Sequence, residues 1–473
     1  MHWLQACGRL LYQRSFKAGM SIVTLQLGQC GNQVGHAFFS SIIEDLASGD
    51  CRRATSGRAV TETDDAYSEV SRNRFFHCTE AGQQQAMRAR AVLCDAEEKV
   101  VAMVTEDAAK SGCWAYANNA KVCLKRGSGN NWAQGYRHHG PKCWPNLSEI
   151  VRRQAEASDR LDGFLALMSL AGGTGSGLGT FVCEQVRDEY PEANLISGLV
   201  WPHSRGEVSV QAYNSVLTTA HLTAACDALL LFENDRLQDA CERRLGLARV
   251  DVGHLNAMIG HQLGAILQPA CGVQSAAAQG PALGGIAASL CPHPDLRLLQ
   301  LRCLPYASER AKEFSGFAWP GLLRHLRQML LAGAAVEEGL DWRQDAALTA
   351  ASGRQRCFAS RLWLRGLGAG SLCPADWEQH LLLPELHPAW LPQSDRLTVC
   401  RTGRPYRGYE RACALVSNCA TGADTLDRSI ARAWSMFAAK AFVHQYARFG
   451  LEEAAFLDCF AAAEQTVFNY RNL

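Results

Sequence analysis

The sequence predicts an α/β protein whose first half is built around a parallel, Rossmann-type β-sheet. Short apolar runs alternate with stretches of helical spacing, beginning at Ser21 and recurring at Gly163, Asn194 and Asp227. Strands that alternate with helices of this length form a parallel sheet covered on both faces. A chain of 473 residues also exceeds what one hydrophobic core usually supports, so we expect more than one domain.

The first predicted strand is SIVTLQLG, which begins at Ser21 and leads into a helix. Apolar side chains then recur every four residues from Val34 to Leu46, which places them on one helix face. The segment GQCGNQ lies between strand and helix, and we expect its Asn32 to cap the helix.

The same pattern returns in GFLALMSLAGGTGSG, which is followed by the helical stretch TFVCEQVRDEYP that Pro191 ends. NLISGLVWP and DALLLFEN predict two more strands. A further helix is predicted from Val252 to Leu267, with Leu255 and Ile259 on its apolar stripe. The small residues of SAAAQGPALGG then predict a linker into a second unit.

The second unit is predicted to be a mixed α/β domain, on the evidence of RLLQLRCLP, GLLRHLRQMLL and RLWLRGLG. After residue 422 the chain is almost free of Gly and Pro and keeps helical spacing. We predict two long C-terminal helices there, with a break near Phe449 and Gly450.

Composition excludes several classes of partner. With 47 basic and 46 acidic residues, charge gives no reason to expect nucleic acid or a membrane surface as a partner. The 20 cysteines are scattered without zinc spacing, which favours reduced thiols. The uncharged window 163–183 holds too many glycines for a membrane span. Residues 1–19 resemble a weak targeting segment, but a start assigned too early, with Met20 as the true start, is the favoured interpretation.

The stretch SLAGGTGSGLGT, from Ser169 to Thr180, follows a predicted buried strand and precedes a helix. Glycines expose backbone N–H groups without steric bulk, and the following helix adds its positive end, which together suit a phosphate. Glycine-rich turns also occur without a ligand, so the loop alone leaves both interpretations open. Neither the Walker A pattern nor the dinucleotide pattern G-x-G-x-x-G fits, which argues against a dehydrogenase.

These segments resemble the tubulin family. AGGTGSG is similar to the family's signature, and other segments match in the family's order: GQCGNQ, CDAEE, GSGNNWAQGY, AYNSVL and HLNAMIGHQLG. The resemblance covers nearly the whole chain from Met20, and within the family it is strongest to the delta type. It implies a tubulin-like fold, with a GTP-binding domain, a central helix, a mixed α/β second domain and a C-terminal helical hairpin.

The resemblance also implies domain bounds and a nucleotide site. The bounds are an extension at 1–19, a GTP-binding domain at 20–250, a core helix at 251–270, an intermediate domain at 271–422 and C-terminal helices at 423–473. The implied cofactors are GTP or GDP and Mg²⁺, with Asp95 and Glu97 at the metal. The residues assigned to the nucleotide are Gly28, Gln29, Cys30, Asp95, Glu97, Asn130, Ser169, Ala171, Gly172, Gly173, Thr174, Gly175, Ser176, Gly177, Glu207 and Asn256.

Several positions depart from the family pattern. A base- or ribose-contacting asparagine falls on Ala225, and the aromatic residue that stacks on guanine falls on Val252. Gln211 stands where a sugar-contacting glutamate is usual, and Glu207 could replace it. The acid with which one subunit activates its neighbour's GTP falls on Gly285, and no Asp or Glu occurs between residues 272 and 294.

The resemblance implies a GTP-binding cytoskeletal subunit of centrioles and basal bodies, acting in triplet microtubules and cilium formation. Its partners would be other tubulin-family subunits and centriolar proteins, with no nucleic acid and no membrane. It would be at most a slow GTPase whose activating carboxylate comes from a neighbour. The alternative is a degenerate tubulin-fold scaffold that binds partners without GTP turnover. The sequence ends without the glutamate-rich tail of bulk tubulins.

Overall fold

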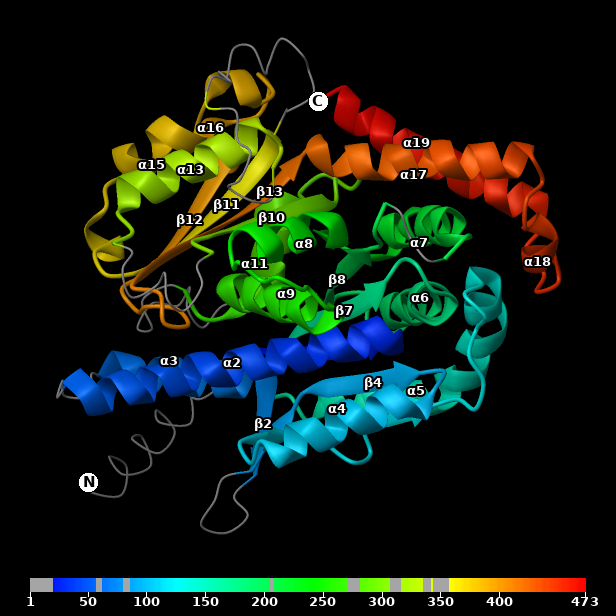
Figure 1. Cartoon of the computed structure of the whole chain (residues 1–473), viewed down its shortest axis with the longest axis horizontal. Helices are drawn as coiled ribbons and strands as arrows, with labels where there is room; N and C mark the ends of the chain where they lie inside the picture. Colours follow the sequence, from blue (N-terminus) through cyan, green and yellow to red (C-terminus); the bar gives the residue numbers. More distant parts are fainter. Residues whose placement is uncertain are drawn as a thin grey trace, which may run out of the picture.

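The computed structural model describes residues 20–56, 62–79, 86–204, 208–270, 281–306, 316–334, 342 and 357–473. The extension predicted at 1–19 and the predicted site residue Glu207 lie outside these ranges. The described chain forms a central sheet with helices on both faces (Figure 1).

One sheet of ten strands runs through the described part of the molecule. In spatial order its strands are β12 (Leu397–Thr402), β11 (Cys357–Gly366), β13 (Arg411–Cys419), β10 (Leu298–Leu304), β9 (Ala228–Glu233), β8 (Asn194–Trp201), β7 (Leu161–Ser169), β1 (Ser21–Leu27), β4 (Ala91–Asp95) and β6 (Lys121–Cys123). All neighbours from β6 to β10 pair in parallel, whereas β13 is antiparallel to β10 and β11. The predicted parallel sheet is confirmed, and the strands of the second unit continue it.

A smaller sheet of three strands lies beside the first. Its strands are β2 (Phe76–Thr79), β3 (Ala86–Ala89) and β5 (Trp114–Ala115). Trp114 packs there against Phe39 with ring centroids 5.4 Å apart, so this sheet is tied to the long N-terminal helix by an aromatic contact.

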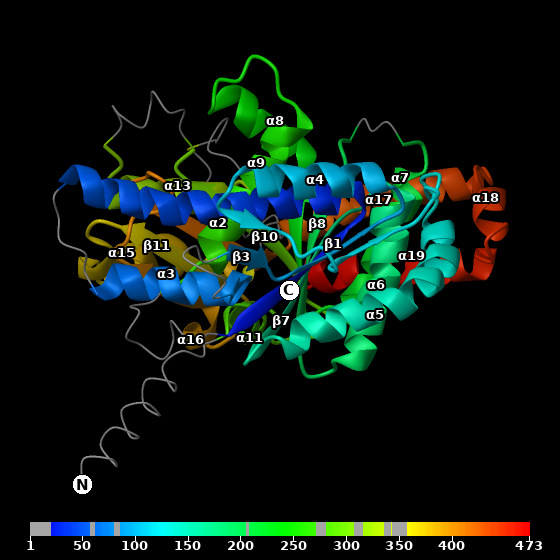
Figure 2. The ribbon, with the colours of Figure 1, turned by 90° about the horizontal axis from the view of Figure 1, so that it is seen from below.

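Helices cover the parallel part of the sheet on both faces. One group packs around the first helix, directly or through α9, and consists of α2 (Gly28–Ser56), α3 (Glu62–Phe75), α4 (Glu98–Lys110), α8 (Asn234–Arg243) and α9 (Val252–Leu267). A second group is formed by η1 (Gln134–His139), α5 (Gly140–Glu156), η2 (Thr174–Leu178), α6 (Gly179–Glu189) and α7 (Gln211–Ala225). Figure 2 shows the same helices from below. As expected, α6 ends just before Pro191, whose ring is disfavoured within a helix.

The second unit and the C-terminus add further helices. Around β10 to β13 lie α11 (Ala282–Leu290), α13 (Trp319–Leu331), η3 (Ala369–Ser371), α15 (Pro374–Leu381), η4 (Pro384–Leu386) and α16 (Gln393–Arg396). The linker predicted in SAAAQGPALGG is wrong at its end, because Ala282 already begins α11. The C-terminal hairpin is formed by α17 (Thr421–Ala438), α18 (Val443–Ala447) and α19 (Glu453–Arg471), and α17 and α19 pack on α7 (Figure 1).

Helices α2 and α9 lie against each other along the sheet. Val34, Phe38 and Leu46 are buried in α2, as their spacing predicts. A Cβ placed on Gly260 of α9 would lie 2.7 Å from the backbone of Ala37 in α2. Only glycine permits so close a crossing, so the two helices touch backbone to backbone there.

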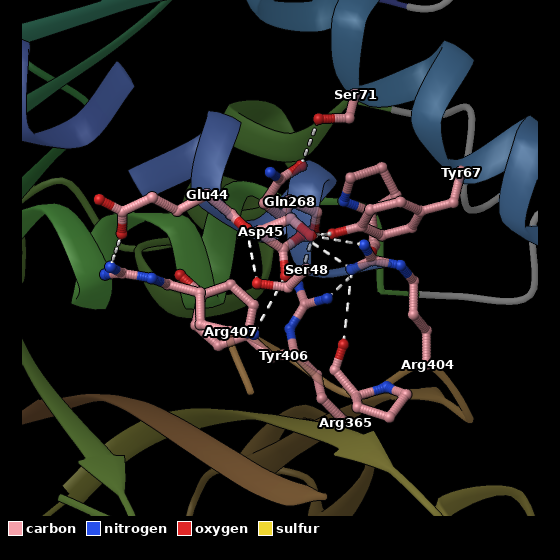
Figure 3. Close-up of polar contacts among 12 residues, drawn as sticks. Glu44, Asp45, Ser48, Tyr67, Ser71, Gln268, Arg365, Arg404, Tyr406 and Arg407 are labelled. Carbon is pink, nitrogen blue, oxygen red and sulfur yellow. Dashed lines mark hydrogen bonds and ion pairs between the residues drawn. The ribbon is translucent and has the colours of Figure 1, made fainter. Parts of the chain in front are cut away.

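Far from the phosphate loops, α2 is held by a group that we call the Asp45 cluster: Asp45, Tyr67, Arg404 and Arg407 (Figure 3). The Asp45 carboxylate accepts hydrogen bonds from Arg404 Nη1 and Tyr67 Oη, each at 2.8 Å, and from the Arg407 backbone N–H at 3.1 Å. The Arg404 guanidinium also lies 3.9 Å from the centre of the Tyr67 ring. Asp45 is 1% exposed, so this buried carboxylate ties α2 to the loop between β12 and β13.

Candidate functional site

Three predicted loops meet at one edge of the sheet. Gly28 follows β1, Asp95 ends β4, and Ser169 ends β7. Strand β1 lies between β4 and β7 and is parallel to both, so the carboxyl ends of all three strands point the same way. In open α/β sheets, ligands bind at this edge. The structure therefore brings together the segments that the sequence assigned to phosphate.

Close packing between the loops requires glycine at two positions. Gly28 has a left-handed φ of 73°, and a Cβ there would lie 2.7 Å from the Gly175 nitrogen. A Cβ on Gly173 would lie 2.5 Å from the backbone nitrogen of Asn131. Gly172 is different, since a Cβ there would meet only Asn130 Oδ1, at 3.7 Å. The loop is therefore open to a ligand at Gly172 and packed against protein backbone at Gly173.

The hydroxyl groups of the glycine-rich loop form hydrogen bonds that stabilise it. Ser169 Oγ accepts a hydrogen bond from the Ala171 N–H at 3.2 Å, and Ser176 Oγ donates to the Gly172 carbonyl. The hydroxyls of Thr174 and Ser128 are 3.0 Å apart. Gly177 is packed on the backbone of the segment that holds Asn131. Free backbone N–H groups thus remain the main ligands that this loop can offer an anion.

Two carboxylates lie beside the loop. Asp95 is 4% exposed and accepts a hydrogen bond from the Ala96 N–H at 2.7 Å. Burial raises the pKa of the Asp95 carboxyl to about 6. Glu97 is exposed, and its Oε1 lies 3.0 Å from the Cβ position of Gly127, over the loop that follows β6. Carboxylate oxygens suit Mg²⁺, so this pair fits the predicted metal.

Further metal ligands would have to come from the nucleotide or from water. Within the described ranges, no group of three His, Cys, Asp or Glu side chains is placed to hold a metal ion. This arrangement agrees with how Mg²⁺ usually binds, through one or two carboxylates plus substrate phosphates.

The remaining predicted residues lie around the same edge. Asn130 adopts a left-handed φ of 55° and turns its Oδ1 toward Gly172. Gln29 is exposed at the start of α2, and burial raises the pKa of the Cys30 thiol to about 12, so this thiol is neutral at physiological pH. Asn256 lies near the start of α9 and is 6% exposed.

The side of the site that is predicted to face the base has no aromatic ring at Val252. Val252 is 58% exposed at the first position of α9, so no aromatic ring stands there to stack on a base. Asp251 caps that helix by accepting a hydrogen bond from the His254 N–H at 3.0 Å. Gln211 is 6% exposed and donates from Nε2 to the His203 carbonyl at 3.0 Å.

Two expectations about polar contacts are wrong. Asn32 does not cap α2: it lies inside the helix, and its Nδ2 donates to the Gly28 carbonyl at 2.9 Å. Ala225 does not line the site. Its carbonyl accepts a hydrogen bond from Arg187 Nε. The same guanidinium also donates to the carbonyl of Ala193, just before β8. Ala225 therefore lies at the amino-end edge of the sheet, away from the phosphate loops.

Sequence reasoning missed the most connected side chain of the site, Asn214. Its Nδ2 donates to the carbonyls of Asn130 at 2.8 Å and Ala171 at 2.7 Å, joining two phosphate loops. The motif AYNSVL, which the resemblance had already singled out, contains Asn214 and was the available signal.

Residues 21–242 match the GTPase domain of the Tubulin/FtsZ family. The tubulin delta chain of Mus musculus is 40% identical over 467 residues, covering 96% of this chain and 100% of the mouse protein. The tubulin delta chain of Homo sapiens is 39% identical over the same shares of both chains.

The chain belongs to the tubulin family.

Membership confirms the fold class and the resemblance to delta-tubulin. A Tubulin/FtsZ GTPase domain binds guanine nucleotide, so the predicted cofactor class is confirmed as well. The contacts of individual site residues with the nucleotide stay predictions. Among the described residues, no helix of this tubulin is long and apolar enough to cross a membrane.

Proposed function

We propose that this tubulin binds Mg²⁺-GTP in the glycine-lined cradle and uses it as the joint with other tubulin-family subunits. The observation that carries the proposal is the meeting of Gly28, Gly172 and Asp95 at the carboxyl edge of the sheet. The resemblance to delta-tubulin extends the proposal to centrioles and basal bodies, where the subunit would support triplet microtubules and cilium formation together with centriolar proteins.

In the proposed site the backbone N–H groups of Gly172 to Thr174 hold the phosphates at the start of η2 and α6. The positive end of that helix favours the anion. Asp95 and Glu97 hold the Mg²⁺ ion, which neutralises phosphate charge, while Asn130 faces the cradle from the opposite loop. Glu207 keeps its proposed role at the ribose, and Asn256 its role at the base.

The proposed subunit does not activate a neighbour's GTP. Gly285 lies inside α11, and its carbonyl accepts a hydrogen bond from Arg361 Nη1. The carboxylate that contacts α11, Asp162, is 2% exposed and accepts from the Ala282 N–H at 2.6 Å. That acid is used as a helix cap, and a guanidinium lies where the resemblance expects an activating carboxylate.

The nucleotide proposal is tested by purifying the full chain and identifying the retained nucleotide by chromatography. We expect GTP or GDP in near-stoichiometric amount. Protein that is empty and does not respond to added guanine nucleotide contradicts the proposal and favours the scaffold alternative, which the exposed Val252 also supports.

The metal assignment needs its own variants. Glu97→Gln should abolish the increase in GTP affinity that Mg²⁺ causes, because it removes a carboxylate ligand. Glu98→Gln is the matched control, since Glu98 is the neighbouring exposed acid on α4. An equal loss of the Mg²⁺ effect in both variants would indicate a general electrostatic effect of the acidic side chains instead of a metal site. Imaging of the tagged protein at centrioles tests the cellular part of the proposal.

A further inference from the structure

One buried amide connects the phosphate loops to the C-terminal hairpin. Asn214 of α7 is 0% exposed. Its Nδ2 group donates to the carbonyls of Asn130 and Ala171, and its Oδ1 accepts from the Trp132 N–H at 3.2 Å and from the Tyr446 hydroxyl at 2.7 Å. Tyr446 belongs to α18, the short helix at the turn of the hairpin.

These contacts use the full hydrogen-bonding capacity of the Asn214 side chain. An amide offers two donor hydrogens and an acceptor oxygen with two lone pairs, and each has a partner here. A buried polar network of this kind is rigid when every member is satisfied and costly when one is removed. A change at Tyr446 is therefore transmitted through Asn214 to the backbone at Asn130 and Ala171.

A second contact joins the same two regions. Asn131 Nδ2 donates to the Gln445 carbonyl at 3.1 Å, and Asn131 is the residue whose backbone packs on Gly173. The chain entering α18 holds Lys440 and Phe442 with left-handed φ values of 53° and 59°. Non-glycine residues keep this conformation only where the surroundings impose it. The turn around α18 is thus held in place by the loops that form the phosphate cradle.

We propose that Tyr446 is a positioning residue for the nucleotide, acting through Asn214, and that nucleotide binding in return orders the turn around α18. The inference rests on the proposed function, because it assumes that the phosphates lie on the loops of Asn130 and Ala171. Coupling between two sites is reciprocal, so both directions must appear together. The C-terminal hairpin then reports the nucleotide state on the outer surface of the subunit.

The test compares two single-hydroxyl deletions in the full chain. Tyr446→Phe removes the bond to Asn214 and keeps the ring. Tyr213→Phe is the matched control: its hydroxyl donates to the Ala441 carbonyl at 3.1 Å, so it ties α7 to the same turn without reaching a phosphate loop. Affinity is measured by titrating Mg²⁺-GTP into nucleotide-free protein, and hydrogen exchange of residues 443–452 is followed with and without GTP.

We expect Tyr446→Phe to weaken GTP binding by about threefold to tenfold, the range that loss of one buried hydrogen bond produces. Tyr213→Phe should stay within about twofold, although both variants lose one hydrogen bond of the hairpin. GTP should slow exchange at residues 443–452 in the parent and the control but not in Tyr446→Phe.

Equal losses of affinity in the two variants would overturn the inference, because they would reflect general loosening of the hairpin. No loss in Tyr446→Phe would overturn it as well. If the parent chain itself does not bind GTP, the proposed function fails first, and the inference falls with it.

Discussion

Helix α2 is held by different chemistry at its first residue, Gly28, and at Asp45 in its second half. Gly28 at the start of the helix meets neutral partners, namely the backbone of Gly175 and Thr174. Asp45, about 26 Å further along the axis, is fixed by the guanidinium of Arg404 and by the Tyr67 hydroxyl and the Arg407 backbone N–H. A site that must accept an anionic ligand is built from neutral donors, whereas a permanent contact is built from paired charges.

The largest expected effect is on the charged contact, at Asp45. Asp45→Asn leaves the Arg404 guanidinium without its buried carboxylate, so it should lower the free energy of unfolding by about 3 to 5 kcal/mol. Urea unfolding followed by circular dichroism measures this change. GTP affinity of the folded variant should stay within about twofold of the parent.

Glu44→Gln is the control for that variant. Glu44 is an exposed partner of Arg407, and exposed ion pairs contribute about 1 kcal/mol or less. If this variant unfolds as easily as Asp45→Asn, the distinction between a buried and an exposed charge is lost.

The next effect is on the neutral, glycine-lined cradle. Gly172→Glu should weaken GTP binding by about 100-fold or more, because a carboxylate beside the phosphates is a like charge. Gly172 is preferred to Gly173, where any side chain would collide with Asn131 and separate the loops. Gly172→Ala should bind GTP nearly as the parent does, and equal loss in Ala and Glu variants would mean a steric cause.

The buried carboxyl of Asp95 should make the GTP affinity of the cradle sensitive to pH. The pKa of Asp95 is about 6, above its usual value of 3.8, so the folded state holds this proton more tightly than the unfolded state. Its ionisation therefore disfavours folding as the pH rises between these values. Mg²⁺ binding depends on pH in the opposite direction. It strengthens as the pH rises, because only the ionised carboxylate is a good ligand.

The Mg²⁺-dependent part of GTP affinity should fall about tenfold from pH 7 to pH 5. Titrations at fixed ionic strength measure it. In Asp95→Asn this pH dependence should disappear, and its persistence would assign the effect to another group.

The smallest expected effect is a gain in GTP affinity. Val252→Tyr places a ring at the exposed start of α9 and should strengthen GTP binding by about fivefold, equal to about 1 kcal/mol of base stacking. Val252→Leu enlarges the apolar side chain without an aromatic face, and the same gain with leucine would exclude stacking as its cause.

The sequence predicted what local patterns encode. The strands that end at Leu27 and Ser169 were found because apolar runs and the turn residues after them are contiguous in the chain, whereas Asp95 was found through the resemblance. The loops follow from the strands, since carboxyl ends of parallel neighbours share an edge.

Contacts over long sequence separations were beyond local patterns. Nothing near Asp45 indicates that its partner is Arg404, and nothing near Asn214 indicates Tyr446. Ala225 was misplaced for a different reason. It lies just before DALLLFEND, and that segment was not used to fix the alignment, so the position was moved from one end of the sheet to the other.

The order of strands has a consequence for synthesis of the protein. Strand β13, residues Arg411–Cys419, fills the gap between β10 and β11, although both precede it in the chain. Until the ribosome has made β13, strand β10 has one edge without a partner. Open edges attract other chains. A nascent polypeptide of this kind needs shielding until almost its full length has emerged, and truncations before residue 411 should aggregate.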